Sequence, residues 1–175
     1  MLLLIKYTLL YGIVLMLVAL GGMFSEHSGI INIALEGIMV IGGVAGVLTL
    51  TMLPADMSPF LVVLISVLVA ALAGMVYSLL LAFASINLKA DQTIGGTALN
   101  LMAPALVLFF IRIIANQNTL QMLTGDAASW FMIKKSTLGI DKSTDLGFFG
   151  ETFINKVYLA TYVCILLFII LSILL

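Results

Sequence analysis

The sequence predicts an all-α polytopic membrane protein, a bundle of transmembrane helices with about five membrane segments. Of its 175 residues, 63% are hydrophobic and 9% are charged, whereas a soluble domain has about 25% charged residues. Apolar runs of about 20 residues recur along the chain, and each could cross a hydrocarbon core roughly 30 Å thick. Short stretches rich in Pro, Gly and polar residues separate these runs, as expected for turns between spans.

The composition also excludes several classes of function. The net charge is −1 and no basic cluster exceeds Lys134-Lys135, so nucleic acid is not an expected partner. The single Cys164 permits neither a disulfide nor a cysteine metal site within one chain. His27, the only His, has no second His four residues later, and no phosphate-binding P-loop is present. We therefore expect no metal, no other cofactor and no ATP site of that type on this chain.

The apolar runs and the polar stretches give the order of the segments. A signal peptide is a poorer interpretation of the first run, because the run is too long and no small-residue cleavage site follows. A long polar and aromatic stretch before the last run is expected to lie outside the membrane, along its surface. The expected spans are residues 1–23, 30–53, 60–86, 94–115 and 157–175, and the extramembrane loop is residues 116–155, all within a single transmembrane domain.

The fourth segment is less regular than the others. Gly95-Gly96 and Pro104 interrupt it, and only residues 105–114 are strongly apolar, with Arg112 among them. Irregular backbone at membrane depth is tolerated where it lies against protein or a cavity. We expect this segment to be kinked or partly re-entrant, with Arg112 reaching the membrane surface.

Two polar residues stand close to the start of the second segment. A charged group at membrane depth costs roughly 2.5–3.5 kcal/mol on insertion scales, so it usually has a partner or a task. Asn32 and Glu36 are four residues apart, which predicts that they share one helix face.

A polar stripe is expected on the fourth segment. Thr93, Thr97 and Asn100 recur at helical spacing, with Gly96 on the same face. Such a stripe usually lines the interior of a bundle or a water-filled path. The alternative, left open at this point, is that Asn32, Glu36 and Asn100 tie neighbouring helices together through buried hydrogen bonds.

Glycines follow the polar start of the second segment at spacings that suit helix packing. Gly42 and Gly46 are four residues apart, a spacing that lets another helix approach closely. We interpret Gly37, Gly42, Gly46 and Gly96 as packing positions.

Two stretches of the sequence resemble a known family. FSEHSGIINIALEGIM (residues 24–39, the first motif) and KADQTIGGTALNLMAP (residues 89–104, the second motif) are similar to the signatures of ABC-importer permease subunits of the branched-chain amino acid and ribose type. The nearest group within that type is the nucleoside, or guanosine-type, permeases. The resemblance covers residues 10–115 by motif and the remainder by hydropathy.

The resemblance implies a transport role without enzyme activity. Two permease subunits would form the path, separate ABC ATPase subunits would hydrolyse ATP, and an extracytoplasmic substrate-binding lipoprotein would deliver a small polar solute such as a nucleoside. The chain would be a multi-pass protein of a bacterial-type plasma or inner membrane, surrounded by lipid. Helix starts near Ser28 and Gln92 would present backbone N–H groups to the solute. The path residues implied are Asn32, Glu36, Thr93, Thr97 and Asn100.

Two departures from the family pattern keep other functions open. Family permeases continue with further spans and a cytoplasmic coupling segment, so the sequence corresponds to an N-terminal portion, incomplete at its C-terminus. A truncated, non-transporting membrane fragment or scaffold is therefore an alternative. An intramembrane enzyme is a weaker one, because Asp56, Asp91 and Asp126 all fall in loops. The distribution of Lys residues favours the opposite membrane orientation to that of the family. Because this count is taken on an incomplete protein, we keep the family orientation as the expectation.

Overall fold

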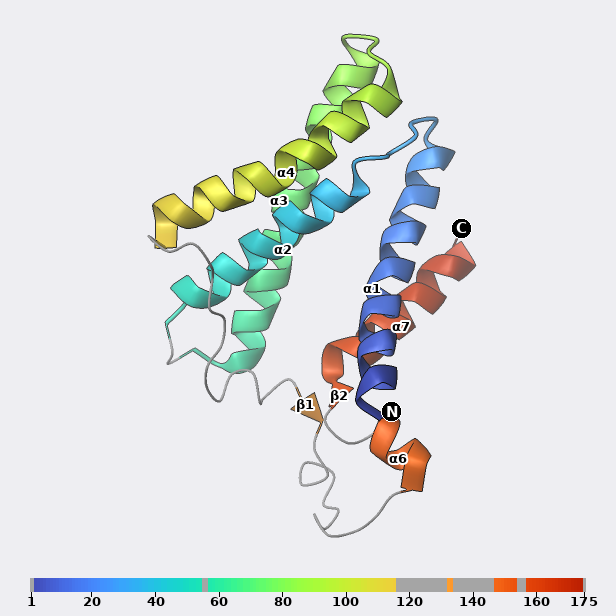
Figure 1. Cartoon of the computed structure of the whole chain (residues 1–175), viewed down its shortest axis with the longest axis vertical. Helices are drawn as coiled ribbons and strands as arrows, with labels where there is room; N and C mark the ends of the chain where they lie inside the picture. Colours follow the sequence, from blue (N-terminus) through green and yellow to red (C-terminus); the bar gives the residue numbers. More distant parts are fainter. Residues whose placement is uncertain (1, 55–56, 116–131, 134–146, 154–156, 175) are drawn as a thin grey trace. The chain divides into compact units, whose positions relative to one another are not determined.

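The computed structural model describes residues 2–54, 57–115, 132–133, 147–153 and 157–174, and these are predominantly helical (Figure 1). The helices are α1 (Leu2–His27), α2 (Leu35–Met52), α3 (Pro59–Ile86), α4 (Gln92–Ala115), α6 (Gly147–Phe153) and α7 (Leu159–Leu174). Two short strands, β1 (Met132–Ile133) and β2 (Val157–Tyr158), pair antiparallel. The expected class, a polytopic all-α membrane protein, is confirmed.

Four helices of the described chain, α1 to α4, are long and apolar enough to cross a membrane. The fifth expected span is shorter than predicted, because β2 occupies Val157–Tyr158 and α7 has 16 residues. At 1.5 Å per residue this helix is about 24 Å long, less than a hydrocarbon core of roughly 30 Å.

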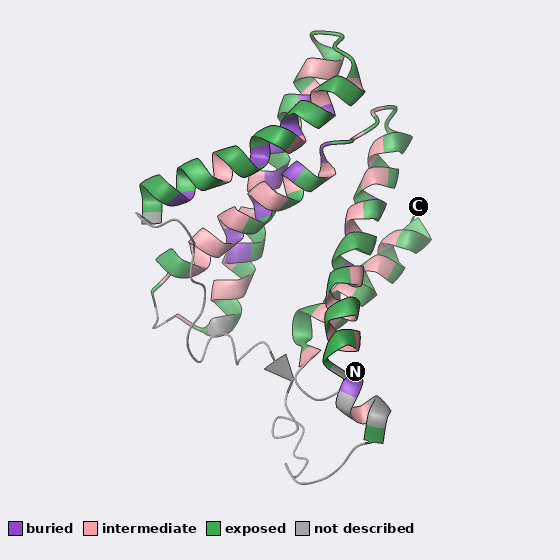
Figure 2. Ribbon diagram, viewed as in Figure 1, coloured by how far each residue is buried: buried purple, intermediate pink, exposed green. Residues whose placement is uncertain are grey.

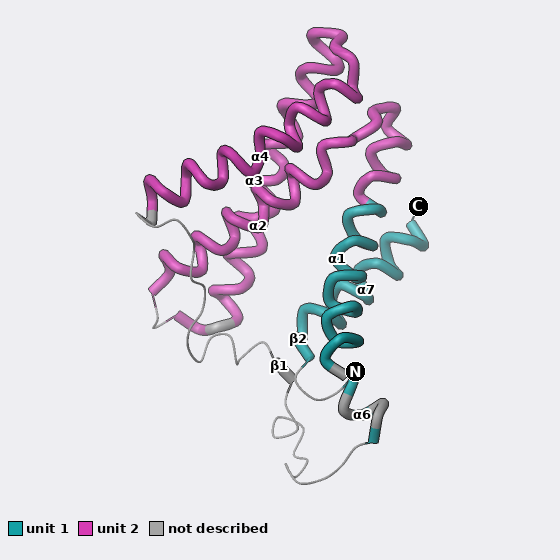
Figure 3. The backbone as a smooth tube through the Cα atoms, in the orientation of Figure 1, with its two compact units in different colours: residues 1–20, 124–175 teal, residues 21–123 magenta. Residues whose placement is uncertain are grey.

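The chain forms two compact units (Figure 3). One unit contains residues 1–20 and 124–175, and the other contains residues 21–123. The second of these holds α2, α3, α4 and the two motifs, and we call it the motif unit.

The core of the motif unit lies where α2, α3 and α4 meet (Figure 2). Its buried members come from both motifs and from α3, and they are Ala34, Tyr77, Leu81, Leu99 and Ala103. Outside this core, large apolar side chains are exposed along the helices. Exposed apolar side chains on helices of spanning length are expected where lipid, and not water, surrounds the protein.

Small residues bring α2 and α3 close together. A Cβ added to Gly42 would lie 3.0 Å from the carbonyl oxygen of Ala70, and one added to Gly46 would lie 3.2 Å from the Ala70 Cβ. Both glycines are buried. The backbones therefore approach at the Gly42-x-x-x-Gly46 face, where larger side chains would push them apart.

The turn after α1 has a clear local cause. Gly29 has φ of 84°, a conformation that glycine adopts without steric cost. Its N–H donates to the Glu26 carbonyl, and the Ile30 N–H donates to the Ser25 carbonyl. This pair of bonds is a Schellman motif, which ends a helix. The chain stays non-helical until α2 begins at Leu35.

The late start of α2 corrects two expectations. The second segment was expected to be helical from residue 30, but Asn32 precedes the helix and only Glu36 lies in its first turn. Asn32 and Glu36 therefore do not share a helix face. The start expected near Ser28 is also wrong, because Ser28 lies in the turn that ends α1.

The remaining segments follow the sequence more closely. Helix α3 begins at Pro59, one residue before its expected span, and ends at Ile86 as expected. Helix α4 begins at Gln92 and is assigned as helix through Pro104, so a bend or re-entry at that point stays a prediction. The expected extramembrane loop, residues 116–155, lies outside the described residues except for β1 and α6.

Candidate functional site

The two motifs meet within the motif unit through hydrogen bonds between side chains of α4 and backbone groups of the first motif. The Ile31 N–H donates to Gln92 Oε1 at 2.8 Å. The Gly37 N–H donates to Asn100 Oδ1 at 2.7 Å, and Asn100 Nδ2 donates to the Ile33 carbonyl at 2.7 Å. Side chains of the second motif thus hold the backbone on both sides of the start of α2.

Glycines make this contact close. A Cβ on Gly96 would lie 2.9 Å from the Ile33 Cβ and 3.2 Å from the Ala34 nitrogen. A Cβ on Gly37 would lie 3.1 Å from both Asn100 Oδ1 and the Leu99 carbonyl oxygen. Because Gln92, Gly96 and Asn100 are spaced four residues apart, they lie on one face of α4, the face that contacts the first motif.

The N-terminus of α2 depends on this contact. The first N–H groups of a helix have no partner within the helix. The N-cap residue Ala34 makes no side-chain cap hydrogen bond, and Asn100 accepts the hydrogen bond of the Gly37 N–H instead. Asn32 contributes locally, since its Oδ1 accepts from the Ala34 N–H at 3.1 Å. The cap of α2 is therefore supplied mainly by a residue 63 positions away in sequence.

The residues of the expected polar stripe on α4 fall into two groups, one that contacts the first motif and one that is exposed. Gly96 is buried and Asn100 is half-buried, and both contact the first motif. Thr93 and Thr97 are exposed in the motif unit, and the Thr97 hydroxyl donates to the Thr93 carbonyl at 2.7 Å. Glu36 is exposed as well. The structure thus separates the residues that join the helices from those that remain accessible.

Two contributors were not singled out from the sequence. The Tyr77 hydroxyl on α3 donates to the Leu99 carbonyl at 2.6 Å, and Tyr77 is buried. Gln92 was noted only as a helix start, although its side chain binds the first motif. A tyrosine within an otherwise apolar helix was the available signal for Tyr77, because a buried Tyr hydroxyl usually finds a partner.

Asn32 is half-buried and lines a hollow of about 440 Å³ between α2 and α3. Ser78 is the other polar side chain of its lining, and Gly42, Ala70 and Gly74 form part of its wall. Glu36, Thr93 and Thr97 do not line this hollow. Of the five expected path residues, Asn32 is the one that lines this hollow.

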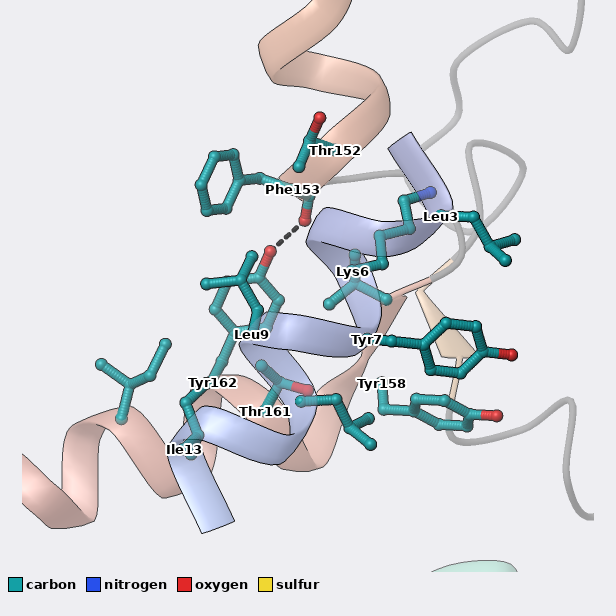
Figure 4. Close-up of a pocket in the computed structure, with 13 residues that line it drawn as sticks. Leu3, Lys6, Tyr7, Leu9, Ile13, Thr152, Phe153, Tyr158, Thr161 and Tyr162 are labelled. Carbon is teal, nitrogen blue, oxygen red and sulfur yellow. Dashed lines mark hydrogen bonds between the residues drawn. The ribbon is translucent and has the colours of Figure 1, made fainter. Parts of the chain in front are cut away.

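The other unit contains a second, mostly apolar cavity of about 230 Å³ (Figure 4). It lies between the start of α1 and residues of α6, β2 and α7, with Tyr7, Tyr158 and Tyr162 in its lining. The Tyr162 hydroxyl donates to the Phe153 carbonyl across one wall. This cavity was not predicted, because residues far apart in sequence form it.

Metal-ligating side chains do not cluster in the described part of the chain, where no group of three His, Cys, Asp or Glu residues could hold an ion. The polar groups that do gather are amides, hydroxyls and backbone groups. These groups bind neutral polar molecules or each other through hydrogen bonds.

Spanning helices, extensive exposed apolar surface and a polar contact between α4 and the segment that leads into α2 define a polytopic membrane protein with a specialised helix junction. Residues 4–175 match the family described as branched-chain amino acid transport system / permease component. The chain belongs to this permease family, and its long apolar helices agree with a multi-pass protein of the cell membrane.

Curated relatives include two nucleoside-related permeases. The chain is 42% identical over 117 residues to the nucleoside ABC transporter permease protein NupC of Lactococcus lactis subsp. cremoris (strain MG1363). This match covers 65% of this chain and 36% of NupC. It is 35% identical over 163 residues to the guanosine ABC transporter permease protein NupQ of Bacillus subtilis (strain 168). This match covers 91% of this chain and 47% of NupQ.

A third relative carries a different substrate name. The chain is 32% identical over 97 residues to the putative glucose ABC transporter permease protein TsgC13 of Haloferax volcanii, covering 55% of this chain and 27% of that protein. The chain thus spans about half or less of the length of these relatives. No solved structure matches it.

Proposed function

We propose that the chain forms part of the transmembrane permease subunit of an ATP-driven ABC importer for nucleosides. The similarity to the guanosine permease NupQ carries this proposal, because it extends over 91% of the chain. Separate ABC ATPase subunits hydrolyse the ATP, a second permease subunit completes the path, and a substrate-binding lipoprotein delivers the solute from outside.

Within this function, Asn32, Glu36, Thr93 and Thr97 are the residues that face the solute path. Amide, hydroxyl and carboxylate groups can together donate to and accept from ribose hydroxyls and the edge of a base. Glu36, Thr93 and Thr97 are exposed in the motif unit and Asn32 is half-buried. Such accessibility supports the proposal, because a group that binds a passing solute must be reachable.

The test compares two charged residues of the motif unit. Glu36 lies in the first turn of α2 and Arg112 in the last turn of α4, so each charge is favourable for its own helix dipole. We expect Glu36→Ala to reduce guanosine uptake more than Arg112→Ala, because only Glu36 belongs to the proposed path. Uptake of labelled guanosine is measured in cells that produce the complete importer, with the membrane level of each variant quantified.

Competition identifies the substrate class in the same assay. Unlabelled nucleosides should reduce guanosine uptake, and glucose should not. Absence of importer-dependent guanosine uptake would refute the nucleoside assignment, and equal losses in the two variants would remove the special role of Glu36. Failure to co-purify with an ABC ATPase would favour the non-transporting fragment.

A further inference from the structure

We propose that Gln92 and Asn100 are positioning residues, which hold residues 30–34 in their non-helical conformation and thereby place Asn32 and Glu36. The placement of this segment is inferred from the contacts alone, and its consequence for transport rests on the function proposed above. Asn100 thus acts through the first motif and not by binding the solute.

The segment needs partners from outside itself. The Schellman bonds at Gly29 end α1, and helical hydrogen bonding resumes only where the Ile38 N–H donates to the Ala34 carbonyl. Backbone groups away from water require hydrogen-bond partners. Gln92 and Asn100 provide them to the Ile31 N–H, the Ile33 carbonyl and the Gly37 N–H.

The chemistry at position 100 is matched to its two partners. One partner is a donor and the other is an acceptor, and a carboxamide offers both kinds of group from a single planar side chain. Aspartate has a similar shape but, when ionised, only accepts, so it keeps the bond from Gly37 and loses the bond to Ile33. Leucine has a similar size and makes neither bond.

The surrounding packing makes the arrangement specific. Gly96, one turn before Asn100, leaves room for Ile33 and Ala34 to lie directly against α4. Ala34 has no exposed surface at all. If the side-chain bonds to Ile33 and Gly37 are lost, residues 30–34 lose their fixed distance from α4, and Ala34 should become accessible more often.

Thiol labelling measures this accessibility without any transport assay. Cys164 is the single native cysteine, so Cys164→Ala gives a background in which Ala34→Cys carries the only thiol. The full chain is purified in detergent and labelled with a water-soluble maleimide. We expect Asn100→Leu to speed labelling about tenfold or more, because two hydrogen bonds to backbone groups are lost. The labelling rate of Asn100→Asp should lie between those of the parent and Asn100→Leu.

Control variants separate positioning from a general loss of stability. Ser85→Ala removes an α3 hydroxyl that bonds only to the Leu81 carbonyl of its own helix, and it should leave the labelling rate within about twofold. Gln92→Met should raise the rate less than Asn100→Leu, because only one backbone bond is lost. If Ala34→Cys does not accumulate, Ala103→Cys serves as the reporter, because Ala103 is also fully buried and lies on α4 beside Gly37.

The outcomes are distinct from those of the uptake test. Equal labelling rates for Asn100→Leu and its parent would overturn the proposal, as would an equal acceleration by Ser85→Ala. In the complete importer, Asn100→Leu should raise the KM for guanosine, with partial recovery in Asn100→Asp. If Asn100→Leu speeds labelling but leaves the KM for guanosine unchanged, the contact does not serve to place Asn32 and Glu36 for transport. If the parent importer moves no guanosine, the labelling result still tests the contact itself.

Discussion

Helices α2 and α4 begin in different ways, although both starts belong to the motifs that define the family resemblance. At α4, Asp91 Oδ1 accepts from the N–H groups of Thr93 at 2.8 Å and Ile94 at 3.1 Å. At α2 the local N-cap is Ala34, which makes no side-chain cap hydrogen bond, and the cap comes from Asn100. The first N–H groups of α4 find their acceptor in an adjacent residue, whereas the Gly37 N–H of α2 finds its acceptor on a second helix.

This difference separates local from tertiary stability. The start of α4 has its N-cap as soon as the helix forms, because Asp91 is adjacent to it. The start of α2 gains the Asn100 bond only when α4 packs against residues 30–37. Mutations that disturb this contact should therefore affect the first motif more than mutations of a local cap.

The largest effect is expected from Gly96→Leu. A Cβ alone would lie 2.9 Å from the Ile33 Cβ, and overpacking of this kind typically costs about 1–3 kcal/mol, with larger values where backbone must move. The free energy of unfolding of the full chain in detergent should fall by about 3 kcal/mol or more. The matched control is Gly43→Leu, because a Cβ at Gly43 would meet nothing within 4 Å. Similar losses in the two variants would show that Gly96 is not a special contact.

Asn100→Leu against Asp91→Ala tests the two caps directly. Loss of Asn100 leaves the part-buried Gly37 N–H without its partner, which costs about 1–3 kcal/mol, and removes the exposed bond to the Ile33 carbonyl, worth about 1 kcal/mol. We expect a loss of about 2–4 kcal/mol in the free energy of unfolding. Loss of the exposed cap Asp91 should cost about 1 kcal/mol. The comparison fails if chemical unfolding in detergent gives the reverse order.

The smallest effect is expected from Tyr77→Phe. This change removes the hydroxyl that donates to the Leu99 carbonyl and keeps the ring in the core, so the net loss should be about 1 kcal/mol. Tyr11→Phe is the matched control, because Tyr11 is 64% exposed. A stability for Tyr77→Phe equal to that of Tyr11→Phe would show that the hydroxyl does not help to join α3 to α4.

The accuracy of the sequence-based expectations follows the same division. The limits of α3 were predicted to within one residue, because hydropathy and the Ser58-Pro59 start are local signals. The start of α2 was placed about five residues too early. Residues 30–34 are mostly apolar and could continue a helix by pattern. In the structure, Ile31 and Ile33 bond to α4, and Ile30 and Ala34 bond to the side chains of Ser25 and Asn32.

The candidate site shows this limit at particular residues. Helical spacing grouped Thr93, Thr97, Gly96 and Asn100 on one stripe. In the motif unit, Gly96 and Asn100 face the first motif, whereas the two threonines are exposed. Helical spacing shows which residues lie on the same side of α4. It does not show which part of that side another helix will cover.

By itself the sequence determined the membrane class, the apolar spans and the two motifs, since the hydrophobic effect and local turn chemistry depend on composition and near neighbours. Only the tertiary structure decided that Asn100 caps α2, that Gln92 binds residue 31 and that Asn32 lies outside the helix. These features depend on hydrogen bonds between residues more than 60 positions apart. No local pattern specifies such pairs until the helices pack.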